Sequence, residues 1–263
     1  MRSTQFMTIK MIGLTSRARI QHILENLPPC KGLILDAGCG AGEFLVSLQL
    51  RSIHAIGLDR DIHQLEMLNG EMRRMGERCQ LVAADLSNLP FRDSLFQAIY
   101  CMEVINMLEK DENALMEFAR VLDHDGTCTL SVPYESYPAI YDPLNRFLEK
   151  RGLGHRQIGI WSPGVKRLYR PSELLPKLRR LGLNPVGLTF IGKWLIPTLE
   201  NYLSLLLYYK VLASKFKTRF AFKTHQAGSV IFNTISKLLD YIIKLDKMPN
   251  LYGTHFIIEA KKS

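Results

Sequence analysis

The stretch LILDAGCGAGEF, residues 33–44, determines the fold that the sequence predicts. An apolar run ends at Asp36, and glycines follow at positions 38, 40 and 42. Glycine lets the backbone turn tightly and lets a ligand approach it without a Cβ in the way. A helix that begins near residue 42 would then point its free backbone N–H groups at that ligand. The stretch therefore predicts a strand, a ligand-binding turn and a helix in direct succession.

Strand-like and helix-like segments alternate downstream of this stretch. Strands are expected at 32–37, 54–59, 79–84, 96–101 and 126–133, and helices at about 42–51, 61–75 and 111–122. An amphipathic helix over 15–27 precedes them and ends before Pro28 and Pro29. Such alternation predicts an α/β fold, in which helices cover both faces of a parallel sheet. Ligands of these sheets bind at the carboxyl ends of the strands.

The acid before the glycines indicates which kind of ligand fits the turn. A dinucleotide-binding turn has the spacing G-x-G-x-x-G/A, which would require a small residue at position 43. The chain has Glu43 there, and its charge would repel a pyrophosphate. Asp36 suits a ligand that carries positive charge at this point, such as an amino group or a sulfonium.

On these residues the chain resembles the Rossmann-like (class I) S-adenosylmethionine-dependent methyltransferases, and within them the small-molecule "type 11" group. The first motif of that family is an acid followed by G-x-G-x-G, here Asp36, Gly38, Gly40 and Gly42. The resemblance implies that S-adenosylmethionine is the cofactor and that the turn binds it.

Three further motifs of the family match at strand ends. Asp59 ends IGLD, where the family's carboxylate accepts both ribose hydroxyls. Asp85 follows CQLVAA and resembles the acceptor for the adenine amino group, with the backbone of Leu86 at the adenine edge. FQAIYCMEVINML, residues 96–108, resembles the fourth-strand motif, which places Cys101, Met102 and Glu103 beside the methionine end and the methyl acceptor. The cofactor site implied by the resemblance consists of Asp36, Gly38, Cys39, Gly40, Gly42, Asp59, Arg60, Asp85, Leu86, Cys101 and Met102.

The chain departs from the family in the fourth-strand motif, where many relatives have a histidine and this chain has Met107. The resemblance covers about residues 30–133 and, more loosely, 172–191 and 254–260, which would add a last helix and two antiparallel edge strands. It implies a seven-stranded, mostly parallel, doubly wound sheet with an antiparallel edge strand. The expected divisions are an N-terminal helical segment (1–29), a methyltransferase core (30–191 plus 251–263) with a lid insertion (134–171), and a helical cap insertion (192–250).

The motifs that would indicate a nucleobase acceptor are absent from the sequence. CMEV follows the fourth strand in place of the Asn/Asp-Pro-Pro-aromatic element, and no Pro-Cys nucleophile is present. The lid insertion has the length of a functional loop, and its side chains that could orient or deprotonate an acceptor are Tyr134, Glu135, Tyr141, His155 and Tyr169. His155 is the first choice because its intrinsic pKa lies near neutrality. The predicted catalytic residues are His155, Glu103 and Tyr134.

The cap insertion combines basic, aromatic and apolar residues. KFKTRFAFK, residues 215–223, interleaves lysine and arginine with phenylalanine, and the helix expected over 229–245 has one apolar stripe. This composition suits an anionic membrane surface, a partner helix or single-stranded nucleic acid. It equally suits a stripe that packs on the sheet edge while the lysines face water. The longest uncharged run, 201–209, is too short to span a bilayer.

Charge and cysteine content bound the remaining possibilities. The net charge is −4 over residues 1–133 and +13 over residues 134–263, so any polyanion partner would meet the second half. Five cysteines without a C-x-x-C pair predict buried, reduced thiols and no metal site. Lys10 interrupts the apolar patch at the N-terminus, so no signal peptide is predicted and a cytoplasmic protein, with peripheral membrane contact through the cap, is expected.

Taken together, these features predict a methyltransferase that transfers the methyl group in line to a small or amphipathic, lipid-like acceptor. Two alternatives stay open at this point. An RNA- or ribosome-directed methyltransferase is favoured by the basic second half. A non-catalytic module that only binds the cofactor would show the same motifs.

Overall fold

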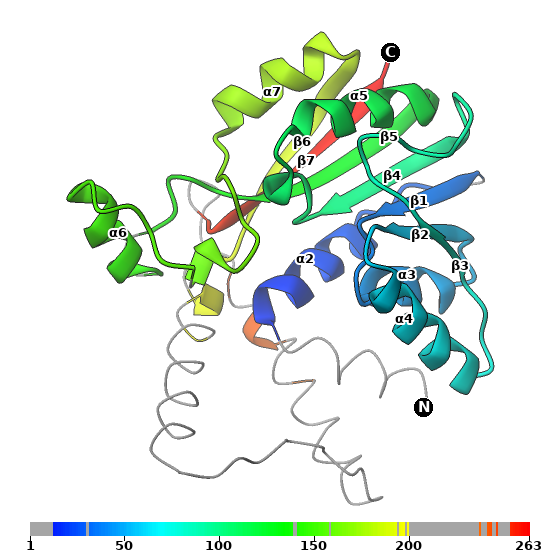
Figure 1. Ribbon diagram of the computed structural model, residues 1–263, viewed down its shortest axis with the longest axis horizontal. Helices are drawn as coiled ribbons and strands as arrows, with labels where there is room; N and C mark the ends of the chain where they lie inside the picture. The colour runs from blue at the N-terminus through cyan, green and yellow to red at the C-terminus, as the bar shows by residue number, and fades with distance from the viewer. Residues whose placement is uncertain are drawn as a thin grey trace, which may run out of the picture.

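The structure of the protein, a computed structural model, contains the predicted sheet at the centre of its fold (Figure 1). The residues it describes are 13–29, 32–138, 141–157, 159–193, 195–197, 199, 237, 241–243, 246 and 253–263. The stretches 201–209 and 215–223, and most of the helix expected over 229–245, lie outside the described residues. The division of the chain into core and cap therefore stays a prediction.

The sheet has seven strands in the order β3-β2-β1-β4-β5-β7-β6. The strands are β1 (Leu33–Ala37), β2 (Ala55–Asp59), β3 (Gln80–Ala83), β4 (Phe96–Met102), β5 (Leu122–Pro133), β6 (Leu183–Ile191) and β7 (His255–Lys262). Strands β1 to β5 pair in parallel, and the order reverses between β1 and β4. The predicted doubly wound, mostly parallel sheet is confirmed.

The sequence predicts that the last two strands are antiparallel and lie at the edge of the sheet. In the structure only β7 is antiparallel, and it lies one position inside the edge. Strand β7 pairs antiparallel with both β5 and β6, so only β6 forms the edge, and it runs in the same direction as β1 to β5. Burial explains this placement, because Phe256 and Ile258 pack on one face of the sheet and Ile257 on the other. A strand that is apolar on both faces belongs inside a sheet. Strand β6 contains Pro185, which cannot donate to a neighbouring strand and is tolerated at an edge.

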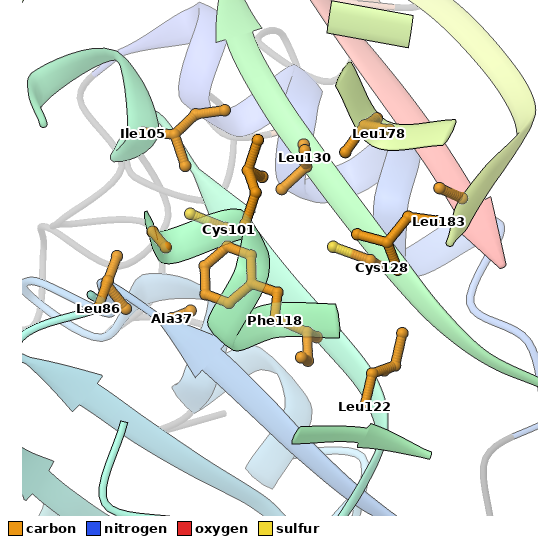
Figure 2. Packing of buried hydrophobic residues seen from close by; sticks show 14 of the residues in the cluster. Ala37, Leu86, Cys101, Ile105, Phe118, Leu122, Cys128, Leu130, Leu178 and Leu183 are labelled. Carbon is orange, nitrogen blue, oxygen red and sulfur yellow. The ribbon is translucent and has the colours of Figure 1, made fainter. Parts of the chain in front are cut away.

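Helices cover both faces of the sheet, as predicted. One face packs against α2 (Leu14–Glu25), α3 (Glu43–Gln49) and α4 (Ile62–Arg74), and the other against α5 (Asp111–Val121) and α7 (Pro171–Arg180). Successive residues of a strand point to opposite faces, so Ile34 belongs to the first cluster and Leu35 to the second. Figure 2 shows Phe118 of α5 and Leu178 of α7 in the second cluster.

The segment between β5 and α7 contains one helix that the sequence does not predict, α6 (Pro143–Lys150), followed by the short 3-10 turn η2 (Gly159–Trp161). Another 3-10 turn, η1 (Ile105–Met107), follows β4. Helix α6 lies apart from the sheet and its covering helices (Figure 1). The one residue of α6 that is buried is polar, Asn145. The sequence of α6 does carry helix signals, because Asp142 caps its N-terminus, Pro143 is its first residue, and Leu144, Phe147 and Leu148 recur at helical spacing. Eight residues are nevertheless too few to stand out within the lid insertion.

The thiols of four cysteines are described, and all are free: Cys39, Cys79, Cys101 and Cys128. Three of them are buried as predicted, whereas Cys79 is partly exposed. Within the described parts of the chain, no helix is both long and apolar enough to cross a membrane.

Candidate functional site

The turn after β1 is held by backbone hydrogen bonds at the carboxyl edge of the sheet. The N–H groups of Gly38 and Cys39 both donate to the Leu58 carbonyl, at 2.7 and 2.9 Å. Gly38, Gly40 and Gly42 all have positive φ angles, which side chains rarely tolerate. At Gly38 a Cβ would also lie 2.4 Å from a methyl carbon of Val104. This glycine is therefore required by packing inside the protein.

Gly40 differs from Gly38 because a Cβ placed on it would meet no protein atom within 4 Å. Its N–H donates to Oδ2 of Asp59 at 2.8 Å, which joins the turn to the end of β2. Oδ1 of Asp59 accepts from the N–H of Asp61 at 3.0 Å. The open side of Gly40 and the Asp59 carboxylate thus lie together at the carboxyl ends of two adjacent parallel strands.

The Asp36 carboxyl group is buried behind this turn. Asp36 is only 2% exposed, and its Oδ2 atom is buried without a hydrogen-bond partner. Burial raises the pKa of Asp36 to about 7, a hydrogen bond from the Leu45 backbone opposes the shift, and the charges of Asp59 and Glu43 add to it. A buried polar atom without a partner is costly, and a positively charged group beside this carboxylate would stabilise it.

Asp85 lies beyond β3, next to the Asp59 end of the sheet. The N–H of Ala84, its neighbour, donates to the Asp59 carbonyl at 3.1 Å. The hydroxyl and N–H of Ser87 both donate to Oδ1 of Asp85 and hold the pKa of that carboxyl below its ordinary value. Leu86 is buried in the apolar cluster under α5. The structure therefore brings Asp36, Asp59 and Asp85 to one edge of the sheet, at the carboxyl ends of the adjacent strands β1, β2 and β3.

At the end of β4, Cys101 and Met102 point to opposite faces. The Cys101 side chain is fully buried in the cluster under α5, and burial raises the pKa of its thiol well above the ordinary value. Met102 packs partly buried against the cluster on the other face. Only the backbone of Cys101 is thus left at the strand end, because its thiol is a core group.

Glu103 follows β4 in a strained conformation, with a φ angle of 59°. The Ser131 hydroxyl donates to its Oε1 at 3.0 Å, and Nη1 of Arg19 lies 2.8 Å from the same oxygen. Its other oxygen, Oε2, lies 3.6 Å from Nε2 of His255. Helix α2, strands β5 and β7 and the residue after β4 thus each contribute one polar group to a cluster that we call the Glu103 cluster: Arg19, Glu103, Ser131 and His255.

Arg19 and His255 were not predicted as site residues. Burial lowers the pKa of His255, the Glu103 carboxylate opposes this shift and Arg19 adds to it. Its other ring nitrogen, Nδ1, lies 2.9 Å from the Thr254 hydroxyl. The sequence gives no local signal for His255, since it reaches the site only because β7 starts beside Pro133, where β5 ends.

The other two predicted catalytic residues have different surroundings. The Tyr134 ring packs against those of Phe190 and Phe256, with centroids 5.1 and 5.9 Å apart. The His155 ring is stacked on Trp161, with centroids 3.7 Å apart, in the segment that contains α6. The contacts described for these two residues do not connect them to Glu103, and their catalytic roles stay predictions.

The remaining candidates of the lid segment have structural partners. The Tyr169 hydroxyl donates to the buried Asp111 at 2.7 Å, and the partly exposed Arg167 and Lys177 pair with the same carboxylate. The Glu135 carboxylate pairs with Arg170 at 2.7 Å. Tyr141 lies buried in a small separate cluster. These contacts anchor the lid segment to the N-terminus of α5 and to its own interior.

Comparison with known proteins agrees with this geometry. The family model described as "Methyltransferase domain" matches residues 35–130. A demethylmenaquinone methyltransferase of Roseiflexus castenholzii is 31% identical over 197 residues, which are 70% of this chain and 81% of that protein. The sterol 4-C-methyltransferase strm-1 of Caenorhabditis elegans is 30% identical over 108 residues, or 40% of the chain and 32% of the relative. Probable tRNA methyltransferase 9B of Mus musculus is 34% identical over 139 residues, or 51% of the chain and 28% of the relative.

The chain thus spans about a third or less of the length of the nematode and mouse relatives. Among solved structures, a SAM-dependent methyltransferase from Archaeoglobus fulgidus has the same fold, with a TM-score of 0.56 and 19% identity. That match covers 94% of this chain and 93% of the archaeal one.

Proposed function

The chain belongs to the class I S-adenosylmethionine-dependent methyltransferases, and from this premise we propose that it transfers a methyl group to a small, amphipathic acceptor. The observation that carries the proposal is the Asp36 carboxylate, buried behind a glycine turn with one oxygen unpartnered. An unpaired buried carboxylate is stabilised by a cation. The cofactor carries both an ammonium and a sulfonium at one end.

When bound, S-adenosylmethionine supplies a methyl group that its sulfonium makes electrophilic. In the proposed site Asp59 binds the ribose hydroxyls, while Asp85 and the Leu86 backbone bind the adenine. The Gly40 turn, with Arg60, Cys39 and the ends of β4 at Cys101 and Met102, encloses the rest. Such positioning removes about 7 to 11 kcal/mol from the barrier of a well-oriented reaction, so the protein needs no universal catalytic group.

Substitution of Gly40 tests whether the turn holds the cofactor. Gly40→Ala should fold, because no protein atom opposes a Cβ there, and should cost about 1 kcal/mol for the positive φ angle. If the open side belongs to the cofactor, the affinity for S-adenosylhomocysteine should fall at least tenfold by calorimetry. Gly76→Ala is a matched control, since Gly76 also has a positive φ and open space but lies after α4. Equal affinities of the two variants would contradict the assignment.

The acceptor side of the proposed site is the Glu103 cluster. A carboxylate at this strand end could receive a proton from an acceptor hydroxyl, which contributes about 10² to 10⁴-fold in rate. Tyr134 and His155 are proposed to orient the acceptor. The names of the relatives support an apolar or amphipathic acceptor, because two of them are named for demethylmenaquinone and sterol methylation.

The acceptor class can be tested by following a labelled methyl group from S-adenosylmethionine. We expect the label to enter the organic phase when the full chain is mixed with a total lipid extract. Incorporation into an RNA fraction would support the second candidate, an RNA-directed methyltransferase. That candidate rests on the +13 charge of residues 134–263 and on the similarity to the tRNA methyltransferase 9B protein. Cofactor binding without incorporation into either fraction would indicate a binding module.

A further inference from the structure

The segment around α6 has an unusual surface. Of the described large apolar residues that are exposed, three fall within ten consecutive positions: Leu144 at 48%, Phe147 at 53% and Leu153 at 67%. They belong to residues 141–157, which we call the α6 lobe. Single exposed apolar residues are common, but a group of this kind marks a site of interaction.

The interior of the α6 lobe is polar and well bonded. Oδ1 and Oδ2 of the buried Asp142 accept from the backbone and the side chain of Asn145, at 3.2 and 2.7 Å. The Asn145 amide also bonds the backbone of Arg156, as donor at 3.1 Å and as acceptor at 2.6 Å. These bonds close the loop from 145 to 156. The lobe therefore buries its carboxylate and its amide and turns its apolar side chains outward.

The outward surface of the α6 lobe is cationic as well as apolar. Lys150, Arg151 and Arg156 are exposed, and the Arg151 guanidinium lies 4.9 Å from the centre of the Phe147 ring. The one carboxylate of the lobe besides Asp142 is that of Glu149. It accepts from the Trp161 indole at 2.9 Å and lies 3.4 Å from Arg146, so its charge is balanced within the protein. The outward surface of the α6 lobe thus presents cations together with leucine and phenylalanine side chains.

We propose that the α6 lobe docks the protein on an anionic bilayer surface. Phenylalanine and leucine side chains enter the boundary between headgroups and acyl chains, while lysine and arginine bind lipid phosphates. Charge complementarity favours an anionic bilayer, because the outward surface of the α6 lobe carries three exposed cations and no unbalanced carboxylate. An RNA would use the cations but would leave the apolar side chains in water. A second copy of the chain would bring the same positive charges together.

This docking surface goes beyond the proposed methyl transfer and does not depend on it. The basic stretch 215–223, for which the sequence also predicts membrane contact, lies outside the described residues, and the α6 lobe is a separate segment. Vesicle binding can be measured without any acceptor. Failure of the lobe to bind vesicles would therefore leave the methyltransferase proposal untouched, and the reverse also holds.

Co-sedimentation of the full chain with vesicles tests the proposal. We expect binding to vesicles of phosphatidylcholine mixed with phosphatidylserine, weakened by salt, and little binding to phosphatidylcholine alone. Changing Lys150, Arg151 and Arg156 together to Gln should reduce partitioning about 100-fold, which corresponds to about 1 kcal/mol per cation. The double variant Phe147→Ser/Leu153→Ser should reduce it at least about tenfold.

Matched controls exist elsewhere on the surface. Ile62→Ser/Val186→Ser removes two equally exposed apolar side chains, and Arg73, Arg74 and Arg78 changed to Gln remove three exposed cations. Both controls should bind vesicles like the wild type. The proposal is overturned if the wild type ignores anionic vesicles at low salt, or if test and control variants lose binding equally. It is also overturned if Phe147→Ser/Leu153→Ser lowers the thermal midpoint as a core substitution does, or converts a dimer to a monomer in gel filtration.

Discussion

Asp36→Asn should stabilise the protein relative to the wild type at pH 8. This gain in unfolding free energy should exceed the gain near pH 4 by about 4 kcal/mol. The wild-type carboxyl has its pKa raised from 3.8 to about 7 by burial. The folded state therefore binds more protons than the unfolded state between these values, and stability falls as the pH rises through this window. Each pH unit in the window costs about 1.4 kcal/mol. An amide has the shape of the protonated acid and carries no charge to desolvate, so the variant escapes this loss.

Urea unfolding of wild type and variant without cofactor, at pH values from 5 to 8, measures the effect. The difference in unfolding free energy should grow with pH and level off above pH 7. Parallel pH profiles would show that Asp36 does not have a raised pKa. The variant should also bind S-adenosylmethionine more weakly at pH 8, since the proposed cation partner is lost. S-adenosylhomocysteine, which lacks the sulfonium, separates the two possible partners: equal losses indicate the ammonium, and a larger loss for S-adenosylmethionine indicates the sulfonium.

The cofactor edge of the fold was predictable because its signals are local. Asp36, Asp59 and Asp85 each close an apolar strand segment, and parallel strands place their carboxyl ends at one edge. Strand and helix boundaries in residues 33–133 likewise follow from apolar periodicity and glycines. Because β1 is apolar at successive positions, it was also predictable that both faces of this strand would be covered by helices.

The acceptor edge was predictable only in part, because it is assembled from distant segments. Glu103 was named from its motif, but Arg19 lies 84 positions before it and His255 follows at the start of the last strand. Neither residue has a neighbour in sequence that reveals its partner. The position of β7 between β5 and β6 depends on the same long-range pairing.

The α6 lobe escaped sequence analysis for a different physical reason. Sequence patterns assume that the apolar side of a helix faces a core. In α6 the buried residue is Asn145, while Leu144 and Phe147 are exposed. An eight-residue helix also gives too short a pattern to stand out within the lid insertion, so the sequence predicts a loop there and gives no sign that His155 stacks on Trp161.

Asp59→Ala should weaken cofactor binding more than any other single change at the proposed site. Two charge-assisted hydrogen bonds to the ribose are at stake, and each contributes about 1.5 to 3 kcal/mol at most. The total loss of about 3 to 6 kcal/mol in S-adenosylhomocysteine affinity, measured by calorimetry, should therefore lie between about 100-fold and about 20,000-fold. NAD should show no comparable binding to the wild type, because Glu43 opposes its pyrophosphate.

The structure adds a complication to this experiment, because the Asp59 carboxylate also accepts from the N–H groups of Gly40 and Asp61. Loss of affinity could then come from a loosened turn and not from the ribose contact. A 2′-deoxy analogue of S-adenosylhomocysteine separates the two causes. It should bind the wild type more weakly than the parent compound, whereas Asp59→Ala should bind both equally, since the partner of that hydroxyl is gone.

Asp61→Ala is the matched control for Asp59→Ala. Its carboxylate lies two positions away and caps α4, accepting from the N–H groups of His63 and Gln64 at 3.0 and 3.2 Å. Loss of this cap should cost about 1 kcal/mol of stability and leave the affinity for S-adenosylhomocysteine unchanged. If a folded Asp59→Ala protein binds as tightly as this control, then Asp59 does not hold the ribose. The carboxylate would then serve only the turn, where its bond to Gly40 already gives it a structural role.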